Sequence, residues 1–334
     1  MIEKQLTTPN QSTTAGFPLS DRSALRIVFM GTPEFAVASL DKLVTAGCNI
    51  VGVITAPDKA GGRGMQLQES AVKKYAVEKG LHILQPEKLK NVEFLTELKA
   101  LQADLQIVVA FRMLPEVVWN MPAMGTINLH GSLLPQYRGA APINWAIING
   151  EETTGVTTFK LQQEIDTGDL LMATAIPIEA TENAGDLHDK MKEIGADLLL
   201  QTVKKLYNGN LQEAPQNSIS GNGNMVLKHA PKIFTETCQV NWDKTADEVY
   251  NLVRGLSPYP TAFTFLELKK LKIYKCEKLV KIPTAATGTF ETDQKTFLHF
   301  ACLDGYLSIE ELQLEGKKKM SIADFLRGYR WLER

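Results

Sequence analysis

The chain has 334 residues, of which 44% are hydrophobic and 22% charged, and its formal net charge is −2. This composition is typical of a globular protein, and a chain of this length favours two domains over a single core. No apolar run approaches the roughly 20 residues that a membrane-spanning helix requires, which excludes a helical membrane protein.

Two local features bear on where the protein works. The first 22 residues are rich in Thr, Ser and Gln and lack the apolar core of a secretory signal, so residues 1–22 are predicted to be a disordered tail. The four cysteines are scattered and no two have C-x-x-C spacing, which argues against a zinc site and against a disulfide framework. We therefore expect reduced thiols, no bound metal and a cytoplasmic location.

Strand and helix patterns alternate through the first part of the chain. Short apolar, often β-branched runs predict buried strands, and the amphipathic stretches between them predict helices. The predicted strands are residues 25–30, 49–55, 104–110, 126–130, 155–161 and 169–177, and the predicted helices are residues 33–46, 72–79 and 186–207. This alternation predicts an α/β fold with a doubly wound, mostly parallel, Rossmann-like sheet, whose ligands bind beyond the carboxyl ends of its strands.

A polar, Gly- and Asn-rich stretch at residues 208–224 is the predicted linker between a catalytic domain over 23–207 and a C-terminal domain over 225–334. The second domain is predicted to be a small OB-like β-barrel. Its predicted elements are a helix at 245–254, short strands within 262–268, 271–278, 288–292 and 297–311, and a closing helix at 320–329. This domain contains 17 Lys and Arg against 14 Asp and Glu, a mild excess that is compatible with nucleic-acid binding.

The candidate catalytic residues lie in N-L-H-G-S-L-L-P-Q-Y-R-G-A-A-P (residues 128–142) and I-D-T-G-D (165–169). Alternation along a strand places Asn128 and His130 on one side, at its carboxyl end. An amide and an imidazole placed in this way can both donate hydrogen bonds to one oxyanion. Asp166, in a turn after the next strand, can orient or charge His130 or accept a proton through water. Taken singly, each residue has a common structural explanation, so the specificity lies in the whole string.

Two Gly-containing segments could be interpreted as a dinucleotide or phosphate site, but neither matches the full motif. Gly31 follows a predicted strand, but the G-x-G-x-x-G pattern of dinucleotide-binding sites is absent. The G-G-R-G sequence at 61–64 is not followed by the Lys-Ser/Thr pair of a phosphate-binding loop. We therefore expect a mobile surface loop there.

The combination of N-L-H-G-S-L-L-P-x-Y-R-G-A-A-P and D-T-G resembles the 10-formyltetrahydrofolate-dependent formyltransferases, in particular those that act on methionyl-tRNA. The resemblance runs from about Leu25 to the C-terminus. It includes R-I-V-F-M-G-T-P-E-F (26–35), A-P-D-K-A-G-G-R-G-M-Q (56–66), V-V-A-F-R-M-L-P (108–115) and R-G-L-S-P-Y-P (254–260).

The resemblance implies a reaction and a set of site residues. The α-amine of initiator methionyl-tRNA would attack the formyl carbon of 10-formyltetrahydrofolate, for translation initiation, without a metal. Asn128 and His130 would form the oxyanion site, with Asp166 as the partner of His130. The implied folate contacts are Ser132, Leu133, Leu134 and Pro135, with Phe111, Arg112, Met113 and Leu114 lining the pterin pocket.

The resemblance also implies tRNA contacts from the loop after the second strand and from the C-terminal domain. The candidate tRNA-binding residues are Lys59 and Arg63 in that loop, Arg138, and Lys269 and Lys270 in a basic hairpin. A monomer is the default expectation.

Three alternatives remain open at this stage. A formyltransferase that acts on a nucleotide-sugar amine or on glycinamide ribonucleotide would share the catalytic trio, although the additional C-terminal domain and the loop favour a large substrate. A hydrolase that releases formate from the same folate would share it too. A non-catalytic RNA-binding protein on a dinucleotide-like fold would have no need for the three side chains together.

Overall fold

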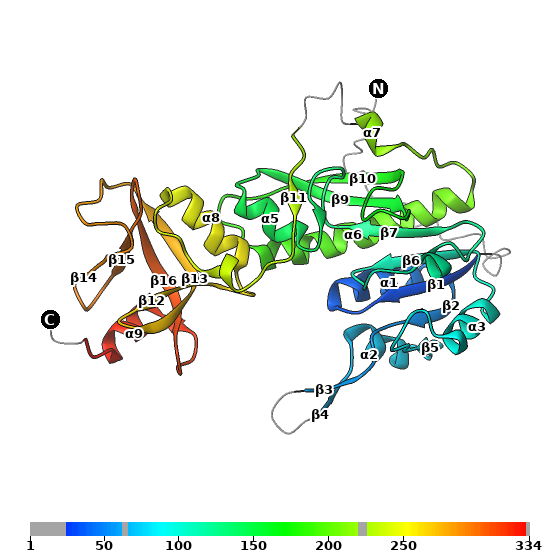
Figure 1. The fold of residues 1–334 in the computed structure, drawn as a ribbon, viewed down its shortest axis with the longest axis horizontal. Coiled ribbons are helices and arrows are strands. Elements are labelled where there is room, and N and C mark those ends of the chain that lie inside the picture. Colours follow the sequence, from blue (N-terminus) through cyan, green and yellow to red (C-terminus); the bar gives the residue numbers. More distant parts are fainter. Residues whose placement is uncertain (1–24, 62–65, 220–225, 332–334) are drawn as a thin grey trace. The chain divides into compact units, whose positions relative to one another are not determined.

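The computed structural model describes residues 25–61, 66–219 and 226–331 (Figure 1). The tail expected at residues 1–22 and the candidate Arg63 lie outside these ranges. The chain folds into two compact units, the first comprising residues up to Arg138 with 155–176 and 189–228. The second comprises 139–154, 177–188 and 229–334, so it includes two segments that precede the predicted linker. No helix in the described ranges is long and apolar enough to cross a membrane.

The first unit is built on a seven-stranded sheet with the order β10-β9-β7-β6-β1-β2-β5. Its strands are β1 (Arg26–Gly31), β2 (Asn49–Ile54), β5 (Ile83–Leu84), β6 (Leu105–Val109), β7 (Thr126–His130), β9 (Thr153–Lys160) and β10 (Leu170–Pro177). The five neighbouring strands β7, β6, β1, β2 and β5 pair in parallel, whereas β9 runs antiparallel to β7. The expected mostly parallel α/β sheet is therefore confirmed.

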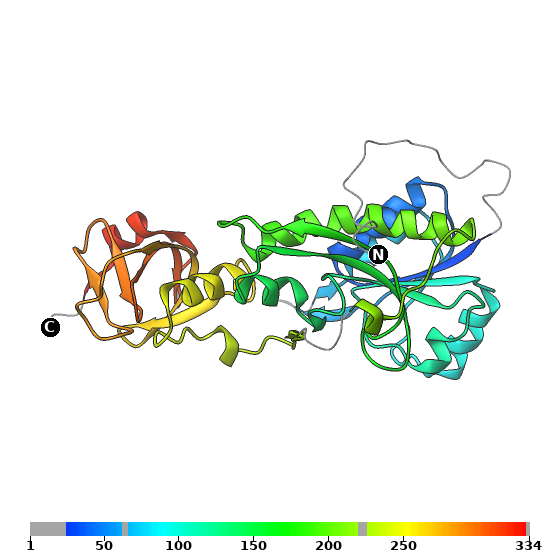
Figure 2. The same cartoon turned by 90° about the horizontal axis from the view of Figure 1, so that it is seen from above.

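Helices cover both faces of this sheet. In Figure 2, the long green helix α6 (Ala184–Tyr207) and the blue α1 (Glu34–Thr45) lie above the strands, and the cyan α3 (Val92–Ala100) lies below them. α6 packs closely, because a Cβ added at Gly195 would lie 2.9 Å from the Leu129 side chain. Strand alternation thus turns Leu129 toward α6 and leaves Asn128 and His130 on the opposite face.

The face below the strands has its own apolar core, formed by side chains from the strands, α3 and the short α4 (Glu116–Trp119). Val108 belongs to this core and pairs with Asn128 on the neighbouring strand. α3 was not predicted from the sequence. It begins at Val92 because the Asn91 side chain accepts a hydrogen bond from the Glu93 amide at the helix start.

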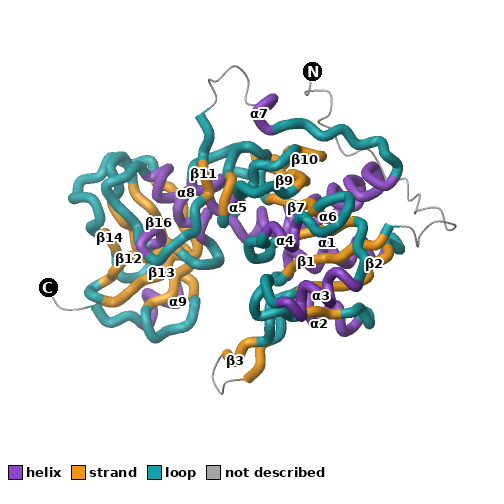
Figure 3. Tube along the Cα trace, turned by 45° about the vertical axis from the view of Figure 1, so that its right-hand side comes forward, coloured by secondary structure: helices purple, strands orange, loops and turns teal. Residues whose placement is uncertain are grey.

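Of the loop expected to be mobile at 61–64, residues 62–64 lie outside the described residues, and Gly61 ends a short strand. β3 (Lys59–Gly61) and β4 (Gln66–Gln68) pair antiparallel, and the hairpin projects away from the sheet of its unit in two views (Figures 1 and 3). It is followed directly by α2 (Ala71–Glu78), whose N-cap Ser70 accepts a hydrogen bond from the Lys73 amide. The hairpin is therefore attached to a capped helix.

The second unit contains an antiparallel sheet with the order β12-β13-β16-β15-β14, to which β17 adds beside β16. Its strands are β12 (Ala262–Leu266), β13 (Lys269–Leu279), β14 (Phe290–Thr292), β15 (Leu298–Ala301), β16 (Tyr306–Leu314) and β17 (Met320–Ser321). This sheet is a half-barrel, since no pairing between β12 and β14 closes it in the described part of the chain. The predicted C-terminal β domain is therefore confirmed, and its form is an antiparallel half-barrel.

The helices of this unit begin at clear sequence signals. α8 (Ala246–Leu256) starts with a capping box formed by Thr245 and Glu248, and α5 (Pro142–Ile148) starts with a proline. α5 packs on α8, where the Asn144 side chain donates to the Gly255 carbonyl at 2.8 Å. The remaining short elements of this unit are β11 (His229–Ala230), the 3₁₀ turn η2 (Glu236–Cys238) and α9 (Ile322–Gly328). The short helix α7 (Gln216–Ile219) belongs to the first unit, and β8 (Arg138–Gly139) lies at the boundary between the units.

Candidate active site

Asn128 and His130 lie where the sequence predicts them, on one face at the carboxyl end of β7. Asn128 is half-buried, and no side-chain hydrogen bond to its amide is found among the described residues. His130 is 7% exposed, and its ring lies edge-on to Phe159 with centroids 6.4 Å apart. The end of β7 thus carries the Asn128 amide, which has no described hydrogen-bond partner, and the His130 imidazole, which packs against Phe159.

Both ring nitrogens of His130 face hydrogen-bond acceptors. Nε2 lies 2.9 Å from the Tyr137 carbonyl oxygen, and Nδ1 lies 3.9 Å from Oδ2 of Asp166. A carbonyl oxygen can only accept, so Nε2 carries a hydrogen; a proton on Nδ1 would face a carboxylate. The 3.9 Å separation is longer than a hydrogen bond and corresponds to an ion pair when the ring is protonated. Acceptors on both sides thus set the orientation of the His130 ring.

Asp166 lies in the connection between β9 and β10 and is 8% exposed. Its φ of +55° is in the left-handed region, which Asp tolerates better than most residues because of its short polar side chain. The structure therefore brings the Asp166 carboxylate to His130, which lies two residues from Asn128 on the same face of β7, and it places Asp166 in a backbone conformation that needs support from its surroundings.

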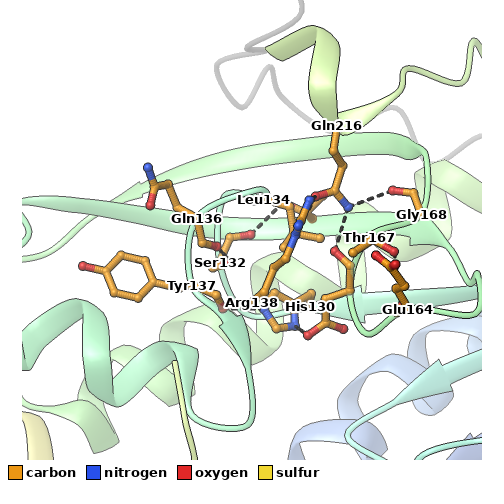
Figure 4. Close-up of polar contacts among 12 residues, drawn as sticks. His130, Ser132, Leu134, Gln136, Tyr137, Arg138, Glu164, Thr167, Gly168 and Gln216 are labelled. Carbon is orange, nitrogen blue, oxygen red and sulfur yellow. Dashed lines mark hydrogen bonds and ion pairs between the residues drawn. The ribbon is translucent and has the colours of Figure 1, made fainter. Parts of the chain in front are cut away.

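That support comes from a residue that sequence reasoning missed. Gln216, in the predicted linker, is 3% exposed and donates from Nε2 to the carbonyl oxygens of Asp166 and Gly168, both at 2.8 Å. Its Oε1 accepts from Arg138 (Figure 4). A glutamine in a polar segment carries no local signal of such a role, because the contact joins residues 50 positions apart.

The predicted folate loop 132–135 follows β7 and is held by hydrogen bonds to its own backbone. Thr157 on β9 donates to the Ser132 carbonyl at 2.7 Å and accepts from the Leu134 amide at 3.2 Å. Ser132 Oγ donates to the Gln136 carbonyl at 2.6 Å. The Leu134 side chain packs with Phe159 in a small apolar core. The loop is thus a fixed wall beside His130, with Leu133 half-buried and Pro135 buried.

The second predicted folate segment, 111–114, follows β6, the strand adjacent to β7 in the sheet. Because β6 and β7 are parallel, their carboxyl ends lie at the same edge, and segments 111–114 and 132–135 both start there. Met113 is 73% exposed and Leu114 is buried. Arg112 is anchored by donating to the carbonyls of Glu87 and Pro86.

A glycine in the turn after Asp166 leaves no room for a larger residue. A Cβ at Gly168 would lie 1.6 Å from the backbone oxygen of Lys160, which cannot yield as a flexible side chain does. We expect Gly168→Ala to lower the free energy of unfolding by at least about 2 kcal/mol and to reduce the melting temperature by roughly 5 °C.

Thermal unfolding measures this effect. Gly328→Ala is the matched control, because a Cβ added at Gly328 meets nothing within 4 Å. An unchanged melting temperature for Gly168→Ala would contradict the close approach of the turn to β9.

The candidate tRNA-binding residues lie in several places. Lys59 is exposed on β3, and Arg138 is half-buried with its guanidinium bonded to Gln216. Lys269 is exposed at the start of β13, and the Lys270 ammonium lies 3.8 Å from the centre of the Phe263 ring. The structure thus places Lys59 and Arg138 in the first unit, and Lys269 and Lys270 together in the second.

Comparison with known proteins assigns the family. Residues 25–203 match the formyl transferase family and residues 232–330 match the formyl transferase C-terminal domain. The methionyl-tRNA formyltransferase of Bacteroides fragilis is 52% identical over 314 residues, which cover 92% of this chain and 96% of that protein. That of Phocaeicola vulgatus is 55% identical over 316 residues, covering 93% and 97%.

Solved structures show the same fold. WlaRD, a sugar 3N-formyltransferase crystallised with dTDP and 5-N-formyl-THF, superposes with a TM-score of 0.63 at 20% identity, covering 88% of this chain and 99% of that one. HypX from Aquifex aeolicus, in complex with tetrahydrofolic acid, gives 0.61 at 19% identity, covering 92% and 48%. The chain therefore belongs to the formyltransferases and, within them, to the family of methionyl-tRNA formyltransferases.

Proposed function

We propose that this protein transfers the formyl group of 10-formyltetrahydrofolate to the α-amine of initiator methionyl-tRNA, with Asn128, His130 and Asp166 as its catalytic residues. The observation that supports the site assignment is that His130 Nδ1 faces the Asp166 carboxylate, while Asn128 lies two residues earlier on the same face of β7. The identity of more than half the residues to methionyl-tRNA formyltransferases over nearly the whole chain supports the substrate.

In the proposed reaction the amine attacks the formyl carbon, and negative charge develops on the formyl oxygen. The Asn128 amide donates a hydrogen bond to that oxygen, and it does not have to break a bond to another described residue to do so. His130 supplies positive charge beside it, since its two nitrogens face the Tyr137 carbonyl and Asp166. Asp166 keeps the ring charged and oriented and accepts, through water, the proton that the amine loses. The oxyanion then collapses, the bond between the formyl carbon and N10 breaks, and N10 of the leaving tetrahydrofolate takes up that proton.

The two segments at the strand ends fit a planar folate. Phe111 is half-buried and Met113 exposed, so 111–114 offers apolar surface, while 132–135 supplies a wall fixed by its hydrogen bonds. Ser132 and Leu134 are occupied by internal contacts, so we propose that the backbone of this loop, with Leu133 and Pro135, contacts the co-substrate. When bound, the folate supplies an activated formyl group, and no metal ion is required.

We propose that the phosphate backbone of the tRNA is contacted by the side chains of Lys59, Arg63, Arg138, Lys269 and Lys270, because cationic side chains contribute salt-dependent affinity for phosphates. The Lys59 hairpin is well suited to meet a large substrate, since it projects from its unit (Figure 3). We further propose that the protein acts as a cytoplasmic monomer.

The test of this function compares three acceptors at equal concentration with 10-formyltetrahydrofolate: methionyl-tRNA, a dTDP-linked amino sugar and glycinamide ribonucleotide. We expect formylation of methionyl-tRNA alone. Formylation of the sugar amine or of glycinamide ribonucleotide with methionyl-tRNA left unmodified would refute the proposed substrate.

The base of the β3–β4 hairpin gives a separate prediction about tRNA binding. The Lys73 ammonium donates a hydrogen bond to the Asp58 carboxylate and forms an ion pair with Glu69 at 2.8 Å. The Gln85 side chain also donates to Asp58, at 2.8 Å. The hydrogen bond from Lys73 lowers the pKa of Asp58. Asp58→Asn weakens this base, so we expect the KM for methionyl-tRNA to rise about three- to tenfold, with an unchanged KM for the folate.

Steady-state kinetics with each substrate varied in turn measure both constants. Glu78→Gln is the control, because its ion pair with Lys79 lies on the α2 surface away from the hairpin base. Equal changes in both KM values for Asp58→Asn would argue against a role for the hairpin in tRNA binding.

A further inference from the structure

Every hydrogen-bonding group of the Gln216 side-chain amide is used. A primary amide has two N–H donors, and those of Gln216 are directed at the carbonyls of Asp166 and Gly168. Oε1 accepts from Arg138 Nε at 3.1 Å and from Arg138 Nη2 at 2.5 Å (Figure 4). A reversed amide would place its oxygen against two carbonyl oxygens and its NH₂ against a guanidinium. Hydrogen-bond chemistry therefore fixes one orientation.

The chain segment that carries Gln216 is itself anchored to the same part of the sheet. Ala214 exchanges two backbone hydrogen bonds with Leu170, at 2.8 and 3.0 Å. One residue earlier, Glu213 forms an ion pair with Lys160 at 2.6 Å. Gln216 is thus delivered to the turn by a fixed segment, although its sequence has the polar composition of a linker.

The contact acts on the backbone of the residue that matters for the chemistry. Asp166 has a left-handed φ, which L-residues disfavour, so the turn relies on external contacts to keep it. Fixing the carbonyls on both sides of Thr167 fixes the backbone of Asp166, and with it the direction of its carboxylate toward His130. Gly168 is also held by its close approach to Lys160, so the specific contribution of Gln216 is to Asp166.

We propose that Gln216 is a positioning residue for formyl transfer, which holds the turn at 166–168 so that the Asp166 carboxylate faces His130 Nδ1. The inference rests on the proposed function, since it requires that Asp166 act in the transfer. Arg138 is part of the same device, because its guanidinium fixes the orientation of the Gln216 amide.

The test replaces the amide while keeping its size. Gln216→Glu still offers Arg138 a partner but loses both donations to the turn, and Gln216→Met fills the same space without polar groups. We expect kcat for formylmethionyl-tRNA formation to fall about 10- to 100-fold in both variants, with unchanged KM values for the two substrates. Gln212→Ala, which changes an exposed residue of the same segment, should keep the wild-type kcat.

A double-mutant cycle with Asp166→Asn separates positioning from general destabilisation. If Gln216 acts through Asp166, Gln216→Glu should lower kcat less than about threefold in the Asp166→Asn background. An undiminished effect in that background, or wild-type kcat in both Gln216 variants, would overturn the inference. If the wild-type chain itself forms no formylmethionyl-tRNA, the proposed function fails. If the wild type is active and only the coupling is missing, the inference alone fails.

Discussion

Replacing Asn128 with Ala is expected to lower kcat for formyl transfer about 100- to 1000-fold, the usual cost of removing one oxyanion donor. The reason lies in the free amide: Asn128 is half-buried, and its side chain has no hydrogen-bond partner among the described residues. Its donors are therefore not committed to another described residue. The loss should fall on kcat rather than on KM, because the interaction strengthens as charge develops on the formyl oxygen.

Single-turnover formylation of methionyl-tRNA at saturating folate measures this effect. Asn120→Ala is the matched control, since Asn120 is an exposed residue at the end of α4. A variant that kept the wild-type rate would remove Asn128 from the oxyanion site, even if the protein proved to be a formyltransferase.

The second large effect is expected for His130→Asn, with a fall in kcat of roughly 100- to 10,000-fold. Asparagine can still donate a hydrogen bond. This variant therefore tests the positive charge of the imidazole and its contact with Asp166, and not merely the presence of a polar side chain at this position. Because the ring is 7% exposed between Phe159 and the 132–138 loop, the substitution also leaves a gap in the wall of the site.

The control for His130 is His82→Asn, which changes an exposed histidine of the same unit. Circular dichroism and the melting temperature establish that each variant is folded before the rates are compared. Near-normal kcat in folded His130→Asn would contradict a role for a charged imidazole in the transfer.

Much of the first unit could be predicted because its strands are buried on both faces. The runs at Arg26–Gly31 and Leu105–Val109 are almost wholly apolar, so their positions follow from composition within about a residue. The shared side of Asn128 and His130 followed from strand alternation alone. The proline and acid at the start of α1 marked its beginning in the same way.

Other features could not be predicted, because their causes lie far apart in the sequence. The paired strands β3 and β4 have only three residues each, too few for a strand pattern to be recognised, and the base of the hairpin depends on Lys73 and Gln85. The 297–311 run contains two strands, because Cys302 and Gly305 close a turn inside it. The closing helix starts at Ile322 rather than Met320, since Met320 and Ser321 pair with β16 first.

Gln216 is the clearest case of a candidate site residue that the sequence leaves hidden. Its segment has the composition of a linker, and the neighbouring Arg138 suggested a phosphate contact. Only the fold shows that the two side chains meet and that the glutamine amide reaches the turn at 166–168. Local patterns report burial and periodicity, whereas this contact depends on the path of the chain after α6.

The most direct test of the proposed chemistry is the identity of the one-carbon product. The wild-type chain is incubated with 10-formyltetrahydrofolate and methionyl-tRNA, and the aminoacyl ester is hydrolysed under mild conditions before mass analysis. We predict formylmethionine in an amount equal to the tetrahydrofolate released. Free formate with unmodified methionine would instead identify a hydrolase and contradict the proposed transfer to the amine.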